Sequence, residues 1–182
     1  VYRMEADGSR MKKLSANYLN DFTPYPLDDG RIIYSRWEYV DKPAIPIQSL
    51  WSINPDGTML QGVFGNRVLS PATFMDAREV PGGQGRILCT LTAHNGPCRG
   101  AVGLIDPRQG ANSPSSIRNL TLEVAIGKTD HGDGNFIRGP YLHPWPLDEQ
   151  RYLVSRAGSV QLRDYEGELV ETLLWRQGPL GF

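Results

Sequence analysis

Two interleaved repeats run through this sequence. One is a series of turns that begin with Asp7, Asp56, Asp106 and Asp164, at spacings of about 50 to 60 residues. The other is a pair of longer elements, Pro26–Arg36 and Pro146–Arg156, which share Pro, Leu, Asp, Arg, Ser and Arg at matching positions. A period of about 50 residues built from short strands is typical of a propeller blade.

Turn-forming residues are numerous and evenly spread. The chain holds 20 glycines and 14 prolines among 182 residues, which exceeds their average use of about one residue in eight. No stretch shows an apolar stripe of helical period and length. We therefore expect an all-β fold, namely an antiparallel β-propeller with four-stranded blades. Propellers close with about four to eight blades, whereas this chain holds about three to four, so we expect a partial propeller.

The repeats divide residues 1–182 into one contiguous array. The expected units are the end of a blade at 1–14, blades at 22–66, 69–110 and 139–175, and an insertion at 111–138. Residues 15–24 are expected to form a connection. Asp28 and Asp148 are expected to make equivalent turn hydrogen bonds, because short carboxylates accept backbone N–H groups at turns.

Charge and hydropathy exclude several classes of protein. The 19 basic and 20 acidic residues are interspersed and give a net charge of −1, so the basic stripe of a nucleic-acid-binding protein is absent. No window reaches the roughly 18 apolar residues of a membrane-spanning helix. No signal peptide is evident, but the chain starts at Val1 inside a strand pattern, so this says little about its compartment.

Some segments resemble known propeller families. Those that resemble the repeats of TolB-type propellers are Tyr2-x-Met4-x-x-Asp7-Gly8-Ser9, Pro26–Tyr34 and Trp51-x-x-Asn54-Pro55-Asp56-Gly57-Thr58. Those that resemble proteins related to the hydrazine synthase alpha subunit, in its middle propeller domain, are Tyr34–Asp41, Ala77–Gly82, Gly103–Asp106 and Pro144–Ser155. The Asp-Gly turns are shared by many propellers, whereas the block Arg36–Asp41 is more specific.

The resemblance implies a propeller architecture and an extracytoplasmic, for example periplasmic, location. Because the array of about three to four blades is incomplete, we also expect the rest of a parent protein, or another chain, to complete the propeller. In such proteins c-type haems are held by Cys-x-x-Cys-His motifs. This chain has none, since its cysteines are Cys89 and Cys98 and Arg99 follows the second. No cofactor is therefore expected in this segment, and haem chemistry is carried over to none of its residues.

Cys89, His94 and Cys98 form the one cluster of soft metal ligands in the sequence. Thiolate and imidazole suit Zn²⁺, but the usual close Cys pair and a fourth ligand are missing. A disulfide across the intervening loop is a second interpretation. Two unlinked cysteines, with Cys89 in a core strand, are the interpretation that the spacing favours.

Two further sets of polar residues are candidate binding sites. Asp130–Asn135 offers oxygen ligands among glycines, as calcium loops do, but it lacks the spacing of the EF-hand loop. Arg36 and Arg156 occupy matching positions of the repeat. We expect them to hydrogen-bond carbonyls or acids between blades, and the alternative is that they line a central channel that accepts an anion.

Motifs for catalysis are missing from the sequence. It contains no phosphate-binding loop and no Gly-x-Ser-x-Gly elbow, so no residue is assigned a catalytic role. We expect a non-catalytic scaffold or interaction segment of a larger extracytoplasmic protein that resembles the hydrazine synthase alpha subunit. One alternative is the propeller domain of a multihaem c-type redox enzyme whose haem motifs lie outside this chain. Another is a propeller-channel hydrolase or lyase, which would need acids or histidines clustered on one rim.

Overall fold

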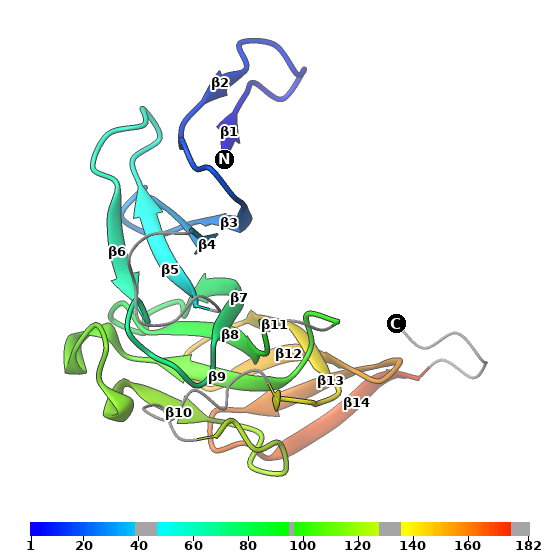
Figure 1. The fold of residues 1–182 in the computed structure, drawn as a ribbon. Coiled ribbons are helices and arrows are strands. Elements are labelled where there is room, and N and C mark those ends of the chain that lie inside the picture. The colour runs from blue at the N-terminus through cyan, green and yellow to red at the C-terminus, as the bar shows by residue number, and fades with distance from the viewer. Residues whose placement is uncertain (39–46, 95–96, 128–135, 176–182) are drawn as a thin grey trace.

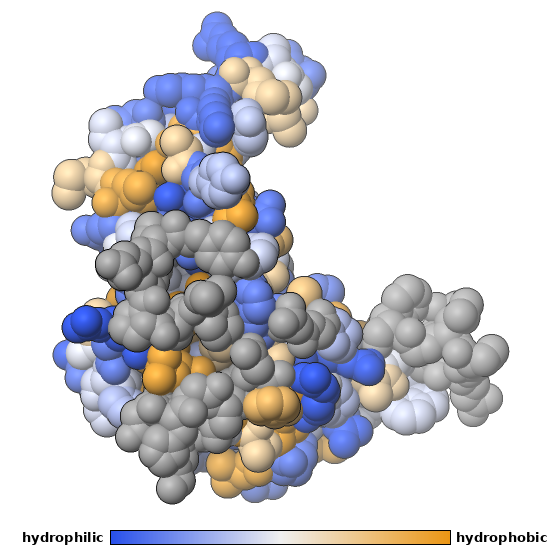
Figure 2. Space-filling model, viewed as in Figure 1, coloured by the Kyte–Doolittle hydropathy of each residue, from blue (hydrophilic) through white to orange (hydrophobic). Residues whose placement is uncertain are grey.

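The computed structural model describes residues 1–38, 47–94, 97–127 and 136–175. Strands make up nearly half of these residues, and the helical turns among them are η1 (Pro107–Gln109) and η2 (Pro114–Ser116). None of the described helices is long and apolar enough to cross a membrane. The sheets follow one another along an arc that does not close (Figure 1, Figure 2). The chain is therefore an all-β partial propeller, and this prediction is confirmed.

Three blades of four strands follow one another along the chain. Blade 1 contains β3 (Asp21–Pro26), β4 (Ile32–Trp37), β5 (Gln48–Ile53) and β6 (Gln61–Phe64). Blade 2 contains β7 (Thr73–Glu79), β8 (Ile87–Thr92), β9 (Ala101–Ile105) and β10 (Ile117–Asn119). Blade 3 contains β11 (Tyr141–Pro146), β12 (Arg151–Arg156), β13 (Ser159–Asp164) and β14 (Leu169–Trp175). Consecutive strands within each blade pair antiparallel, and one parallel pairing, Gln48 with Thr73, links blades 1 and 2.

A short hairpin, β1 (Tyr2–Arg3) and β2 (Lys12–Lys13), precedes blade 1. Its turn belongs to a series of four in which an aspartate Oδ1 accepts the backbone N–H two residues further on. The aspartates are Asp7, Asp56, Asp106 and Asp164, at 2.9, 2.9, 3.1 and 3.0 Å. The last three turns join the third and fourth strands of blades 1, 2 and 3. The hairpin is thus equivalent to the outer two strands of a blade, and the repeated turn is confirmed.

The longer repeated element matches in register. Arg36 of β4 pairs with Asp21 of β3, and Arg156 of β12 pairs with Tyr141 of β11 at the equivalent place. Both ladders then shift register after one further pair of residues. The two elements are therefore structural as well as sequence repeats.

The turns of these elements differ in one detail from the prediction. The carboxylate that accepts the turn N–H groups is Asp148 in blade 3 but Asp29, not Asp28, in blade 1. Gly30 has a φ of +85°, a conformation that glycine adopts without a steric cost. Gln150 occupies the equivalent position in blade 3 and is not among the residues with positive φ. The two turns thus have different backbones, and the acceptor moves by one residue.

Two stretches lie differently from the expected connection and insertion. β3 begins at Asp21, inside the stretch 15–24 that was expected to be a connection. Its prolines are tolerated because β3 is bulged and, among the described strands, pairs with β4 alone. Within 111–138, β10 supplies the fourth strand of blade 2, and Leu120 and Thr121 after it are 2% and 0% exposed. This stretch therefore contributes a strand to blade 2, whereas an insertion between blades was expected.

Burial differs sharply between the blades. Every residue of β8 and β9 in blade 2 is buried. In β13 of blade 3, buried residues alternate with partly exposed ones. Strands enclosed on both faces have no solvent-facing row, whereas strands covered on a single face alternate. Blade 2 is thus packed on both sides, and blade 3 on one side.

The outer side of blade 1 is covered by the segment that precedes it. Leu14 packs against Tyr34 and Ile53 in a small cluster separate from the main core. The Lys12 ammonium group donates a hydrogen bond of 2.7 Å to the carbonyl of Asp56. The start of the chain therefore covers the face of blade 1 that points away from blade 2.

Candidate functional site

The first strand of each blade carries a bulge at the same place. β3, β7 and β11 each shift register against their partner strand. Residues in these bulges, Thr23, Asp76 and His143, have φ values of 46°, 55° and 51°. Left-handed backbone is uncommon outside glycine, and bulges with such strain concentrate at functional sites. Because β7 contacts both β3 and β11, three polar side chains stand at equivalent positions on adjoining inner strands.

These three residues form a polar row across the blades. The backbone N–H of Asp76 donates to the Thr23 hydroxyl at 3.1 Å, and His143 Nε2 lies 4.0 Å from Asp76 Oδ2. The Thr90 hydroxyl donates to the same carboxylate oxygen at 3.4 Å. The Asp76 side chain is 9% exposed and that of His143 is 65% exposed. The row therefore combines a buried carboxylate with an accessible imidazole.

An arginine sandwich lies two residues beyond the row. The Arg78 guanidinium lies over the Tyr25 ring, 4.4 Å from its centroid, and over the Trp145 ring at 4.2 Å. The two rings contact each other edge to face at 5.7 Å. Each residue comes from a different blade, so this cation–π stack joins all three inner strands.

The sequence carries a signal for these inner strands that sequence reasoning missed. Pro24-Tyr25-Pro26 and Pro144-Trp145-Pro146 repeat the pattern Pro-aromatic-Pro. Each pattern follows directly on the bulge residue of its strand. A search for that pattern would have found the first strands of blades 1 and 3.

Arg36 is enclosed by partners from blade 1 and from the segment before it. Its guanidinium approaches Asp21 Oδ1 at 3.4 Å and Glu38 Oε2 at 3.0 Å, and it donates to the Ala16 carbonyl at 3.1 Å. It also lies over the Trp51 ring at 5.3 Å. Arg36 thus bonds two acids and a carbonyl, and these partners lie within blade 1 and the segment before it.

Arg156 belongs to a second polar cluster, around Tyr141. Arg156 Nε and Arg163 Nη1 both donate to the Tyr141 hydroxyl, at 3.0 and 2.9 Å. That hydroxyl in turn donates to Glu123. Burial raises the pKa of Tyr141. Burial also opposes ionisation of Glu123, but the hydrogen bond from Tyr141 and the nearby guanidinium groups hold the pKa of that carboxyl below its usual value.

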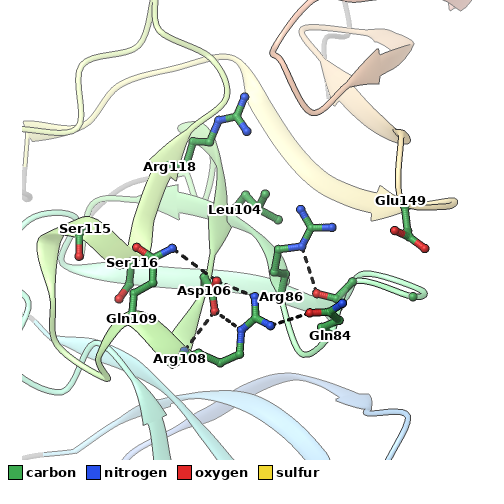
Figure 3. A pocket seen from close by; sticks show the side chains of 12 residues that line it. Gln84, Arg86, Leu104, Asp106, Arg108, Gln109, Ser115, Ser116, Arg118 and Glu149 are labelled. Carbon is green, nitrogen blue, oxygen red and sulfur yellow. Dashed lines mark hydrogen bonds and ion pairs between the residues drawn. The ribbon is translucent and has the colours of Figure 1, made fainter.

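A cavity of about 360 Å³ lies on the rim between blades 2 and 3. Its walls are the β7–β8 turn, the connection from β9 to β10 with η1 and η2, and Glu149 from the β11–β12 turn (Figure 3). Three arginines, Arg86, Arg108 and Arg118, line it with two acids, Asp106 and Glu149. The rim cavity therefore has a polar, mixed-charge lining drawn from two blades.

Most of these charges are already paired. Arg108 binds both carboxylate oxygens of Asp106 at 2.8 Å and donates to Gln84 at 2.9 Å. The hydrogen bonds from Arg108 lower the pKa of Asp106 to about 2. Arg118 pairs with Glu166 at 2.6 Å. These pairs fix two walls of the rim cavity.

The predicted metal ligands lie in different surroundings. Cys89 is buried in β8, Cys98 is exposed, and both are free cysteines. His94 Nδ1 is 2.9 Å from the Gln48 amide nitrogen, and its ring packs against Trp37. Across the described part of the chain, no three His, Cys, Asp or Glu side chains gather as metal ligands. The calcium-type segment Asp130–Asn135 lies outside the described residues.

Comparisons with known proteins show a structural likeness. No family model matches the chain, and no curated protein matches it. Its fold is similar to a solved structure of hydrazine synthase from Kuenenia stuttgartiensis, with a TM-score of 0.65 and 18% sequence identity. The match covers 90% of this chain and 21% of that chain. The likeness shows a shared fold, and this chain spans about a fifth of the length of the other.

Proposed function

We propose that this chain is a non-catalytic scaffold segment of a larger propeller, in which a further blade packs against blade 3. The observation that carries this proposal is the open face of blade 3. Leu153, Val160, Leu162 and Leu174 share that face, because Leu153 pairs with Leu162 and Val160 pairs with Leu174. The first three are partly exposed, and Leu174 is 67% exposed.

The other blades indicate what covers such a face. In blade 2, every residue of β8 and β9 is buried, and the blade contacts both blade 1 and blade 3. Blade 3 has the same four-stranded meander, but it has a neighbour on one side only within the described residues. An exposed apolar face on a β-sheet is a liability that proteins normally cover. Within this array a blade already packs against another blade at two interfaces, so a further blade is the partner that fits the open face.

The outermost strand supports the same interpretation. All seven residues of β14 are exposed, and Leu169, Leu173 and Trp175 are among them. At the other end of the array, Tyr2 and Met4 of the hairpin are 62% and 58% exposed. Apolar side chains are therefore exposed at both flanks, where the next units of a propeller would pack.

Substituting one leucine of the open face tests the proposal. In residues 1–182, Leu162→Glu should reduce the binding of a hydrophobic dye and reduce self-association, with little change in melting temperature. In a longer protein that carries the next blade, the same substitution should be destabilising, because burying a leucine contributes about 1.5–3 kcal/mol. Leu147→Glu is the matched control, since Leu147 is exposed on a turn away from this face.

Two results would contradict the proposal. If residues 1–182 sediment as a monomer and bind no hydrophobic dye, the open face needs no partner and the proposal fails. It also fails if Leu162→Glu leaves the longer protein as stable as before.

The other sequence-based hypotheses stay predictions. A multihaem redox parent requires Cys-x-x-Cys-His motifs in the sequence that adjoins this chain, which a haem stain of the intact protein detects. The extracytoplasmic location is tested by fractionating cells that express the intact protein. A propeller-channel hydrolase or lyase would need an acid or histidine cluster on one rim. In the described part of the chain, the row Thr23, Asp76 and His143 offers one acid and one histidine.

A further inference from the structure

Two oppositely charged side chains of the rim cavity have no partner to neutralise them. Arg86 makes one side-chain hydrogen bond, from Nε to the Gly83 carbonyl at 3.0 Å, and forms no ion pair with any described carboxylate. Glu149 makes neither an ion pair nor a hydrogen bond with the described residues. The Nη groups of Arg86 and the carboxylate of Glu149 are therefore free to bind a ligand.

The placement of both groups is defined by the blades that carry them. Arg86 is partly buried and ends the β7–β8 turn of blade 2. Its charge acts on Tyr165 of blade 3, where it opposes the rise in pKa that burial causes. Glu149 reaches back from blade 3, since a Cβ at Gly82 would stand 2.5 Å from its Oε1. Figure 3 shows the Arg86 guanidinium between the side chains of Leu104 and Glu149 in this view.

From this arrangement we infer that the rim cavity binds a small zwitterion, a molecule with a carboxylate at one end and an ammonium group at the other. The planar fork of Arg86 suits the carboxylate, because guanidinium and carboxylate form paired charge-assisted hydrogen bonds. The carboxylate of Glu149 accepts hydrogen bonds from the ammonium group. The proposed site is separate from the open face of blade 3.

The size of the cavity agrees with a small organic ligand. Its volume of about 360 Å³ falls in the range of about 300–1,000 Å³ in which proteins bind small molecules. The Asp106–Arg108 pair is already satisfied on both carboxylate oxygens, so it does not compete for the ligand. Leu104 is the apolar side chain among the lining residues.

A simple anion is the competing ligand, and charge argues against it. An anion bound at Arg86 would share the cavity with the unpaired carboxylate of Glu149, and like charges repel. A ligand with both charges turns that repulsion into an attraction. The two ligands therefore respond in opposite ways to the loss of the Glu149 charge, and this difference makes the proposal testable.

The test uses four probes with the purified protein: β-alanine, γ-aminobutyrate, acetate and methylammonium. Titration by calorimetry or by NMR shifts should show that an amino acid binds the wild type more tightly than either singly charged probe. Arg86→Gln should weaken amino-acid binding by about 10- to 100-fold, the effect of one charge-assisted contact. Glu149→Gln should weaken it as well, but should strengthen acetate binding.

Arg151→Gln is the control, because Arg151 begins β12 and pairs with Asp148, and neither residue lines the rim cavity. Its amino-acid affinity should match the wild type. Circular dichroism checks that each variant is folded. If Arg86→Gln does not fold, Glu149→Gln still tests the proposal, because Glu149 is exposed. Failure of both amino acids to saturate the protein by about 10 mM overturns the proposal. So does acetate binding as tight as amino-acid binding in the wild type, which would indicate a simple anion site.

Discussion

Replacing Arg78 with leucine should loosen the contact among all three blades at once. The Arg78 guanidinium lies 4.4 Å from the Tyr25 ring centroid and 4.2 Å from that of Trp145. A cation–π contact contributes about 0.5–1 kcal/mol at exposed sites and about 2 kcal/mol when desolvated. Two contacts at a partly buried site therefore stabilise the fold by about 2–3 kcal/mol.

One term opposes this loss. The Arg78 Nε is buried without a hydrogen-bond partner, and removing such a group returns about 1 kcal/mol. The net loss in the free energy of unfolding is then about 1–2 kcal/mol. For a chain of this size each kcal/mol lowers the melting temperature by about 2–4 °C, so Arg78→Leu should lower it by about 2–8 °C.

Urea unfolding of single and double variants measures the effect. A double-mutant cycle of Arg78→Leu with Trp145→Leu should give a coupling energy of about 1 kcal/mol. Arg151→Leu serves as the control, because its ion pair with Asp148 at 3.2 Å is exposed and such pairs contribute about 0–1 kcal/mol. If Arg78→Leu is as stable as the wild type and the coupling is zero, the stack does not hold the blades together.

Three further perturbations follow from the geometry. Gly100→Ala should lower the free energy of unfolding in a urea titration by about 1–3 kcal/mol, since its Cβ would stand 2.1 Å from the Leu91 carbonyl oxygen. Gly62→Ala should be nearly neutral in the same titration, because a Cβ at Gly62 would have nothing within 4 Å. A thiol reagent should label Cys98 in the native protein and Cys89 only after unfolding, because burial raises the pKa of the latter thiol; stoichiometric zinc in protein purified without added metal would contradict this. Asp106→Asn should destabilise the protein at neutral pH. This carboxyl has its pKa lowered from 3.8 to about 2 by an arginine, so its stabilisation is present above pH 3.8 and lost as the pH falls through about 2. If Asp106→Asn lowers the free energy of unfolding equally in urea titrations at neutral pH and at a pH of about 2, that assignment is refuted.

Local signals explain why much of the fold could be predicted. The turns at Asp7, Asp56 and Asp164 depend on a short carboxylate and the glycine that follows within three residues, and both are visible in the sequence. β3 and β10 were missed because their signals conflict. Prolines in β3 indicate a loop, and the short β10 follows a run of turn residues in 111–138.

The candidate sites depend on packing between blades, which no local pattern contains. Arg86 and Glu149 lie in turns of different blades, and their approach follows from how blades 2 and 3 pack. Thr23, Asp76 and His143 likewise come together through three inner strands. The sequence pointed instead to Cys89, His94 and Cys98. These residues are close along the chain, but within the described residues they do not come together as metal ligands.

The complete burial of β8 and β9 has a consequence for how this molecule opens. An array of sequentially connected units opens most easily from its ends, because an end unit breaks one interface and a central unit breaks two. Amide hydrogens of blade 2 should therefore exchange with solvent only when the whole array unfolds, while those of β1, β2 and β14 should exchange through local opening. Blade 2 is then the last part of the array to open, and the two flanks open without unfolding it.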